Sequence, residues 1–134
     1  MPVLTRSFVK ASLITLVVGL LIGIWQQIPG FGIPGLSPVY LHLLTFGWLT
    51  QLIFGVALWM FPVYTKEQPR GPAWLGWTIF ACLNLGLLLR LIFEPLQGLA
   101  PSIIGGWMLV LSALLQWLAG VGFIINIWPR VRGK

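Results

Sequence analysis

Charged and metal-ligating side chains are scarce in this sequence. Of its 134 residues 7% are charged, two are acidic, and there is one histidine and one cysteine. The lone Cys82 excludes a disulfide framework and a thiolate metal cluster. Glu67 and Glu94 are expected in loops at opposite ends, too far apart for a paired-carboxylate site. Phosphate-loop, H-E-x-x-H and nucleophile motifs are also missing, so no complete catalytic centre is predicted and hydrolytic chemistry is excluded.

Apolar residues dominate what remains. They make up 58% of the chain, which is typical of integral membrane proteins. A membrane-spanning helix needs about 20 mostly apolar residues. Four segments meet this requirement: 11–28, 38–61, 73–92 and 103–128. The sequence therefore predicts an all-α fold, an integral membrane four-helix bundle that occupies residues 1–134 as a single domain.

Local signals set the predicted ends of these segments. Ser37 and Pro38 offer an N-cap and a first-turn proline to the second segment. Pro72 stands at the start of the third, which Pro95 is expected to end, and Pro129 is expected to end the fourth.

The first apolar segment could be either a signal peptide or a retained helix. Arg6 and Lys10 precede it, as basic residues precede a signal sequence, but no small-residue cleavage site follows the run 11–25. Gly19 and Gly23 form a small-xxx-small face suited to helix packing. We therefore expect a retained helix.

The basic residues indicate an orientation. If the four segments alternate, seven of the eight cations fall on one side: Arg6, Lys10, Lys66, Arg70, Arg130, Arg132 and Lys134. Arg90 falls on the other side, near Glu94. The positive-inside rule then places both termini in the cytoplasm, and a bacterial inner membrane is the expected location. The net charge of +6 reflects this topology and attraction to membrane lipid, and no nucleic-acid partner is expected.

His42 is the residue whose chemistry matters most. It lies about one helical turn inside the outer, non-cytoplasmic end of the second segment. A neutral imidazole in a membrane span is either a buried hydrogen-bonding group or a metal or haem ligand. Phe46 shares its face, Gln51 points the opposite way, and no polar partner is expected on its own helix. A structural role would use Tyr40 or Arg90 as the partner, and both roles stay open on these grounds.

The run His42-Leu-Leu-Thr-Phe-Gly-Trp-Leu, with Gly55 and Pro62 after it, resembles a known helix. It is similar to the second transmembrane helix of haem-copper oxidase and nitric oxide reductase catalytic subunits. The likeness is greatest to short four-helix relatives described as oxidase subunit I-like, and it covers residues 40–62. In that family the helix carries an axial histidine to a low-spin haem. The resemblance thus implies that His42 is the metal ligand of a b-type haem.

The same resemblance implies further site residues. Tyr40 and Phe46 would lie at the haem, and Arg90 would pair with a haem propionate through a charge-assisted hydrogen bond. Many relatives have histidine where this chain has Tyr40, and the helices with copper ligands are absent. The second axial ligand would therefore come from another copy or a partner subunit. The family's twelve helices form three arcs of four, so a homo-oligomer is expected, a trimer rather than a dimer.

Three functions follow as hypotheses. The first is an oxidase subunit I-like membrane protein that binds haem through His42 for electron transfer or gas sensing. The second is a non-catalytic structural or accessory subunit of a respiratory or other energy-transducing complex. The third, a small-molecule transporter, is disfavoured because polar groups within the segments are few.

Overall fold

The structure, a computed structural model, describes residues 1–131. Its secondary structure in these residues is entirely helical, with loops between the helices. The elements are α1 (Val3–Gln26), α2 (Leu36–His42), η1 (Leu43–Thr50), α3 (Gln51–Met60), α4 (Ala73–Leu99) and α5 (Ile103–Val131). Because α2, η1 and α3 follow without a break, they form one helical rod over Leu36–Met60. Four helices are therefore long and apolar enough to cross a membrane, which confirms their predicted number.

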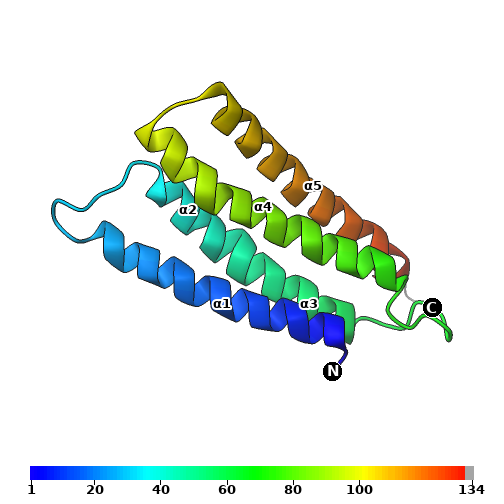
Figure 1. The fold of residues 1–134 in the computed structure, drawn as a ribbon. Coiled ribbons are helices and arrows are strands. Elements are labelled where there is room, and N and C mark those ends of the chain that lie inside the picture. The colour runs from blue at the N-terminus through cyan, green and yellow to red at the C-terminus, as the bar shows by residue number, and fades with distance from the viewer. Residues whose placement is uncertain (132–134) are drawn as a thin grey trace.

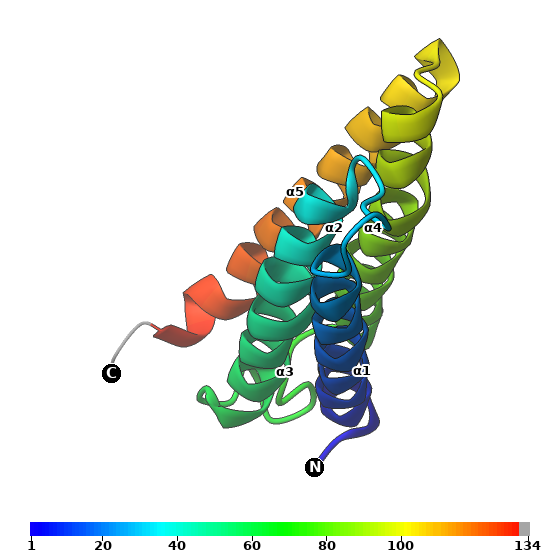
Figure 2. The ribbon, with the colours of Figure 1, turned by 90° about the vertical axis from the view of Figure 1, so that its left-hand side faces the viewer.

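The helices lie side by side in chain order. Figure 1 shows α1, the rod α2–η1–α3, α4 and then α5 (Figure 1). The first helix packs along the rod, and α5 packs chiefly along α4. In the view turned by 90°, α5 is tilted relative to α1 and the rod (Figure 2). A core of buried apolar side chains joins all four spans: Phe8, Val39, Leu43, Leu58, Ile79, Leu83, Leu87, Ala119 and Ile127.

The two prolines expected to end helices do not end them. The helix α4 runs through Pro95 to Leu99, and α5 runs through Pro129 to Val131. A proline removes one backbone hydrogen bond but leaves the chain free to continue as a helix where neighbouring helices support it. These two boundary predictions were wrong. One consequence is that Glu94 lies inside α4 and is buried, where a loop was predicted.

The starts of the first two spans also differ from the prediction. The helix α1 begins at Val3, before the apolar run, and includes the exposed Arg6 and Lys10. The rod begins at Leu36, with Gly35 as N-cap in the left-handed conformation at φ 85°. A Cβ on Gly35 would collide with the carbonyl oxygen of Glu94, so glycine is required here for its backbone and for space.

Ser37 does not cap the rod, contrary to the prediction. Its Oγ donates a hydrogen bond to Oε1 of Gln26, over 2.8 Å, and so links the start of the rod to the end of α1. The small-residue face of α1 is used within the chain: Gly19 packs on Leu43, and Gly23 packs on the ring of Tyr40.

Arg130 is buried within the protein, not exposed at a membrane surface. It is 4% exposed and donates hydrogen bonds to the carbonyl oxygens of Leu58, Phe61 and Pro62 at the end of α3. Arg130 therefore lies at the end of the molecule where α3 ends, and it belongs to α5 instead of following it. The two remaining cations of the predicted basic side, Arg132 and Lys134, lie outside the described residues.

Candidate functional site

His42 lies where the rod changes from α-helix to π-helix. The segment η1, Leu43–Thr50, is a π-helix, with hydrogen bonds five residues apart instead of four. Such segments are rare and are found frequently at functional sites. Thr45 supports the transition by donating from Oγ1 to the carbonyl oxygen of Leu41 over 2.7 Å. The sequence carries no periodicity signal that would have revealed this change of helix type.

The imidazole of His42 is held by its own helix. Its Nδ1 lies 2.8 Å from the carbonyl oxygen of Pro38, one turn earlier. A carbonyl oxygen can only accept, so Nδ1 carries the hydrogen in this contact. Nε2 then has the free lone pair, and residues 1–131 include no hydrogen-bond partner for it. The expectation that His42 has no polar partner on its helix was wrong, because a backbone carbonyl supplies one.

His42 lines a groove of about 470 Å³ to which the rod, α4 and α5 all contribute. This volume lies within the range of small-molecule sites, which combine apolar walls with a few polar groups. The ring of Phe46 stacks on the imidazole, with centroids 5.8 Å apart and planes 18° apart. The lining residues are His42, Phe46, Arg90, Ala113, Gln116, Trp117, Gly120, Val121 and Ile124.

Arg90 lines the groove and forms an ion pair with Glu94. Its Nη1 donates to Oε1 of Glu94, one turn along α4, and the side chains are 18% and 7% exposed. Two buried atoms of the pair, Arg90 Nε and Glu94 Oε2, have no hydrogen-bond partner in the described chain. A buried polar group without a partner is unusual. The charge of Arg90 is therefore balanced, but its buried Nε has no acceptor in the described chain.

Three of the four predicted site residues come together, and the fourth does not. His42, Phe46 and Arg90 share the groove, whereas Tyr40 lies against α1. Tyr40 lines a separate cavity of about 330 Å³ beside Gly23. Its ring therefore packs between helices and does not face His42.

Gln116 is a groove residue that the sequence did not single out. It lies on α5, and its Nε2 is 3.4 Å from Oγ of Ser112, which in turn donates to the carbonyl oxygen of Gly86 over 2.6 Å. The sequence contains only a modest indication that Gln116 belongs to a site, because it is one of few amides inside a predicted membrane-spanning segment. This chain of hydrogen bonds fixes the distance between α4 and α5 beside the groove.

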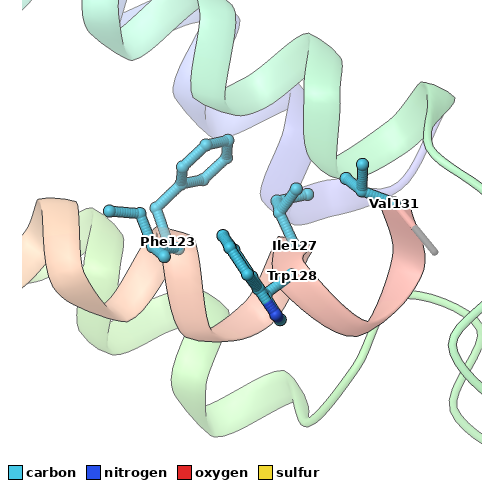
Figure 3. Close-up of a pocket in the computed structure, with 5 residues that line it drawn as sticks. Phe123, Ile127, Trp128 and Val131 are labelled. Atoms are coloured by element: carbon cyan, nitrogen blue, oxygen red, sulfur yellow. The ribbon is translucent and has the colours of Figure 1, made fainter.

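A second groove, also about 470 Å³, lies at the end of α5 (Figure 3). Apolar residues of α5 line it: Phe123, Ile124, Ile127, Trp128 and Val131. The ring of Phe123 stacks on Phe54 of α3, with centroids 3.8 Å apart. Among its lining side chains only Trp128 has a polar group, the indole N–H, so this groove is the weaker candidate.

The described residues contain no group of three or more His, Cys, Asp or Glu side chains placed to hold a metal ion. Any metal centre on His42 would thus need a ligand frame that a cofactor or another chain provides. Comparison with protein-family models, with curated proteins and with solved structures finds no match to this chain.

Proposed function

We propose that this chain is a multi-pass protein of a bacterial inner membrane with both termini in the cytoplasm. The support is a set of exposed cations at the end of the molecule where α1 and α4 begin and α3 ends: Arg6, Lys10, Lys66 and Arg70. Toward the opposite end of the helices, Arg90 is neutralised by Glu94. Such an excess of exposed Lys and Arg marks the cytoplasmic side of membrane proteins.

At the groove, we propose that His42 is an axial ligand of a b-type haem. The hydrogen bond from Nδ1 to Pro38 is the observation that carries this proposal. Metal-ligating histidines almost always donate their other ring nitrogen to a carbonyl or carboxylate, which fixes the tautomer and orients the ring. The residues fit the group in two further respects: Phe46 and Trp117 offer aromatic walls, and Arg90 lines the groove, where its guanidinium would pair with a propionate. Haem would supply a reversible one-electron carrier or an iron site for a small gas.

The oxidase subunit I-like resemblance and the shape of the site support an oligomer. One imidazole gives one axial ligand, and in the isolated chain the groove lies open to its surroundings. A second copy, or a partner subunit, would cover the groove and supply the other ligand. We propose a homo-oligomer, with a trimer favoured, that acts in electron transfer or gas sensing.

The accessory-subunit alternative is favoured by one observation. Arg90 is already paired with Glu94 inside the chain, so its charge needs no propionate. On this alternative the groove is a packing surface for another subunit of an energy-transducing complex. His42 then has only the structural role of its hydrogen bond to Pro38 in the same helix.

The visible spectrum of the purified protein separates these functions. The haem proposal predicts a Soret band and resolved α and β bands on reduction, whereas the accessory function predicts a colourless protein. The substitution His42→Ala should remove the bound haem and leave the helical circular dichroism unchanged. Thr50→Val is a matched control on the same helix, since Thr50 does not line the groove. Equal haem content in wild type and His42→Ala would refute the ligand assignment.

A further inference from the structure

A pocket of mixed charge lies at the basic end of the molecule, distant from the His42 groove. It has a volume of about 330 Å³ and lies between the start of α1 and the start of α4. The loop 67–72, with Glu67 and Arg70, forms one wall, and Trp77 of α4 forms another. We propose that this pocket binds the headgroup of a phospholipid that carries both a phosphate and a primary ammonium, as phosphatidylethanolamine does.

The charges of the pocket are available to a ligand. Glu67 and Arg70 are three residues apart and both are exposed, yet the only ion pair in residues 1–131 joins Arg90 to Glu94. The Arg70 side chain also has no hydrogen bond within these residues. One free carboxylate and one free guanidinium in a single pocket match a ligand that has one charge of each sign.

Each half of the headgroup has its own recognition elements. The phosphate would bind to Arg70 and to the N-terminus of α4 at Ala73, because a helix N-terminus favours an anion. The ammonium would form an ion pair with the Glu67 carboxylate and a cation–π contact with the face of Trp77. Trp77 is 43% exposed, and the neighbouring Trp74 is 69% exposed. Exposed tryptophans of this kind sit at headgroup level in membrane proteins, which is the depth at which such a lipid would present its charges.

The loop that carries Glu67 and Arg70 is ordered by its own hydrogen bonds. The N–H of Tyr64 donates to the carbonyl oxygen of Pro69 over 2.9 Å, and the N–H of Gln68 donates to Oγ1 of Thr65 over 2.9 Å. Asn126 of α5 donates to the carbonyl oxygen of Arg70 over 3.3 Å. The loop is thus fixed through its backbone, which leaves the two charged side chains free. Because the backbone of the loop is already fixed, a ligand has to order only these side chains, which lowers the entropy cost of binding.

Native mass spectrometry of the detergent-purified full chain, with lipids added one at a time, tests this proposal. Phosphatidylethanolamine should be retained better than phosphatidylglycerol, which lacks the ammonium, and better than phosphatidylcholine, which cannot donate a hydrogen bond to Glu67. Arg70→Gln should lower phosphatidylethanolamine retention about threefold to fivefold, as expected for the loss of one exposed charge contact. Glu67→Gln should abolish the preference over phosphatidylglycerol.

Lys66→Gln is the matched control, because Lys66 is an exposed cation next to Glu67 that does not line the pocket. It should leave retention and preference unchanged. Equal loss of retention in Lys66→Gln and Arg70→Gln would show attraction by net charge only and would overturn the proposal. A wild-type preference for phosphatidylglycerol, or no retained lipid, would overturn it as well. None of these outcomes depends on haem, so the proposed function of His42 stands or falls separately.

Discussion

Nε of Arg130 donates a hydrogen bond to the carbonyl oxygen of Pro62 over 2.8 Å, across 68 positions of the sequence. Nη2 of the same guanidinium reaches the carbonyl oxygens of Leu58 and Phe61 at 3.2 and 2.8 Å. The last carbonyl groups of a helix have no partner within it and carry partial negative charge. Arg130 therefore closes the end of the rod from another helix and fixes α5 to it.

Replacing Arg130 should cost more stability than its terminal position suggests. Arg130→Leu leaves these carbonyl oxygens without a donor, so we expect a loss of about 1.5–3 kcal/mol, the range for hydrogen bonds to charged groups. The melting temperature in detergent should fall accordingly. Arg130→Lys should recover part of the loss, because one ammonium cannot reach three carbonyl groups in a fork geometry.

Arg6→Leu is the control for this prediction. Arg6 is an exposed cation of α1 at the same end of the molecule, and its removal should change the melting temperature little. Equal melting temperatures for Arg130→Leu and Arg6→Leu would show that Arg130 does not stabilise the fold.

The sequence predicted the helices well because the signal was long and apolar. Four spans, and the rod that carries His42, followed from runs of about 20 apolar residues. The predicted helix ends at Pro95 and Pro129 were wrong for a physical reason. They considered the one backbone hydrogen bond that a proline removes and did not consider the packing of neighbouring helices. The error at Pro95 also placed Glu94 in a loop, which hid a largely buried ion pair within α4.

The site was predictable in part for similar reasons. Phe46 follows His42 by one turn, so its place beside the imidazole could be read from spacing alone. The positions of Tyr40 and Gln116 depend on how α1 and α5 pack on their neighbours, which no local pattern encodes. The π-helix and the hydrogen bond to Pro38 are likewise products of the folded rod.

A buried amide pair provides a second test of the fold. Nε2 of Gln51, which is fully buried, donates to Oδ1 of Asn84 over 3.2 Å, and Nδ2 of Asn84 donates to the carbonyl oxygen of Phe80. Asn84→Leu leaves the whole Gln51 amide without a partner, because its Oε1 already has none in the described residues. We expect a loss of about 1–3 kcal/mol.

The double substitution Gln51→Leu with Asn84→Leu should lose less stability than Asn84→Leu alone, since no buried amide is then left unpaired. Chemical denaturation of the three variants in detergent measures this double-mutant cycle. A double variant that is less stable than Asn84→Leu by the full effect of Gln51→Leu would show that the two amides act independently.

The orientation of the chain can be tested with reporter fusions. We expect a fusion after Gly35 to report the non-cytoplasmic side and a fusion after Lys134 to report the cytoplasm, because the exposed cations lie at the end that includes Lys66 and Arg70. The Lys66→Glu and Arg70→Glu double substitution should weaken this bias. A cytoplasmic signal at Gly35 together with an external signal at Lys134 would show that the orientation is inverted.

We expect the protein to be an oligomer, because the groove at His42 is open in a single chain and needs a second copy to cover it. The mass in a mild detergent or in nanodiscs should be a multiple of the chain mass of 14.9 kDa, with three copies favoured. Gly19 and Gly23 pack within the chain, so they are not available to an interface. A stable monomer that still contains haem would contradict the need for a second copy.

Gly120 of α5 lines the groove, and Gly86 of α4 packs against Gln116 beside it. These two glycines offer the sharpest test of the role of the groove. A Cβ on Gly120 would meet no atom within 4 Å, whereas a Cβ on Gly86 would lie 2.9 Å from Cγ of Gln116 and 3.0 Å from the carbonyl oxygen of Ser112. Gly120→Leu should therefore leave the fold stable and fill the space beside His42, so that haem content falls. Gly86→Leu should force α4 and α5 apart and lower the melting temperature, with a cost of about 1–3 kcal/mol for overpacking. If Gly120→Leu retains the wild-type spectrum, the groove does not hold the cofactor, and the role of His42 reduces to its hydrogen bond with Pro38.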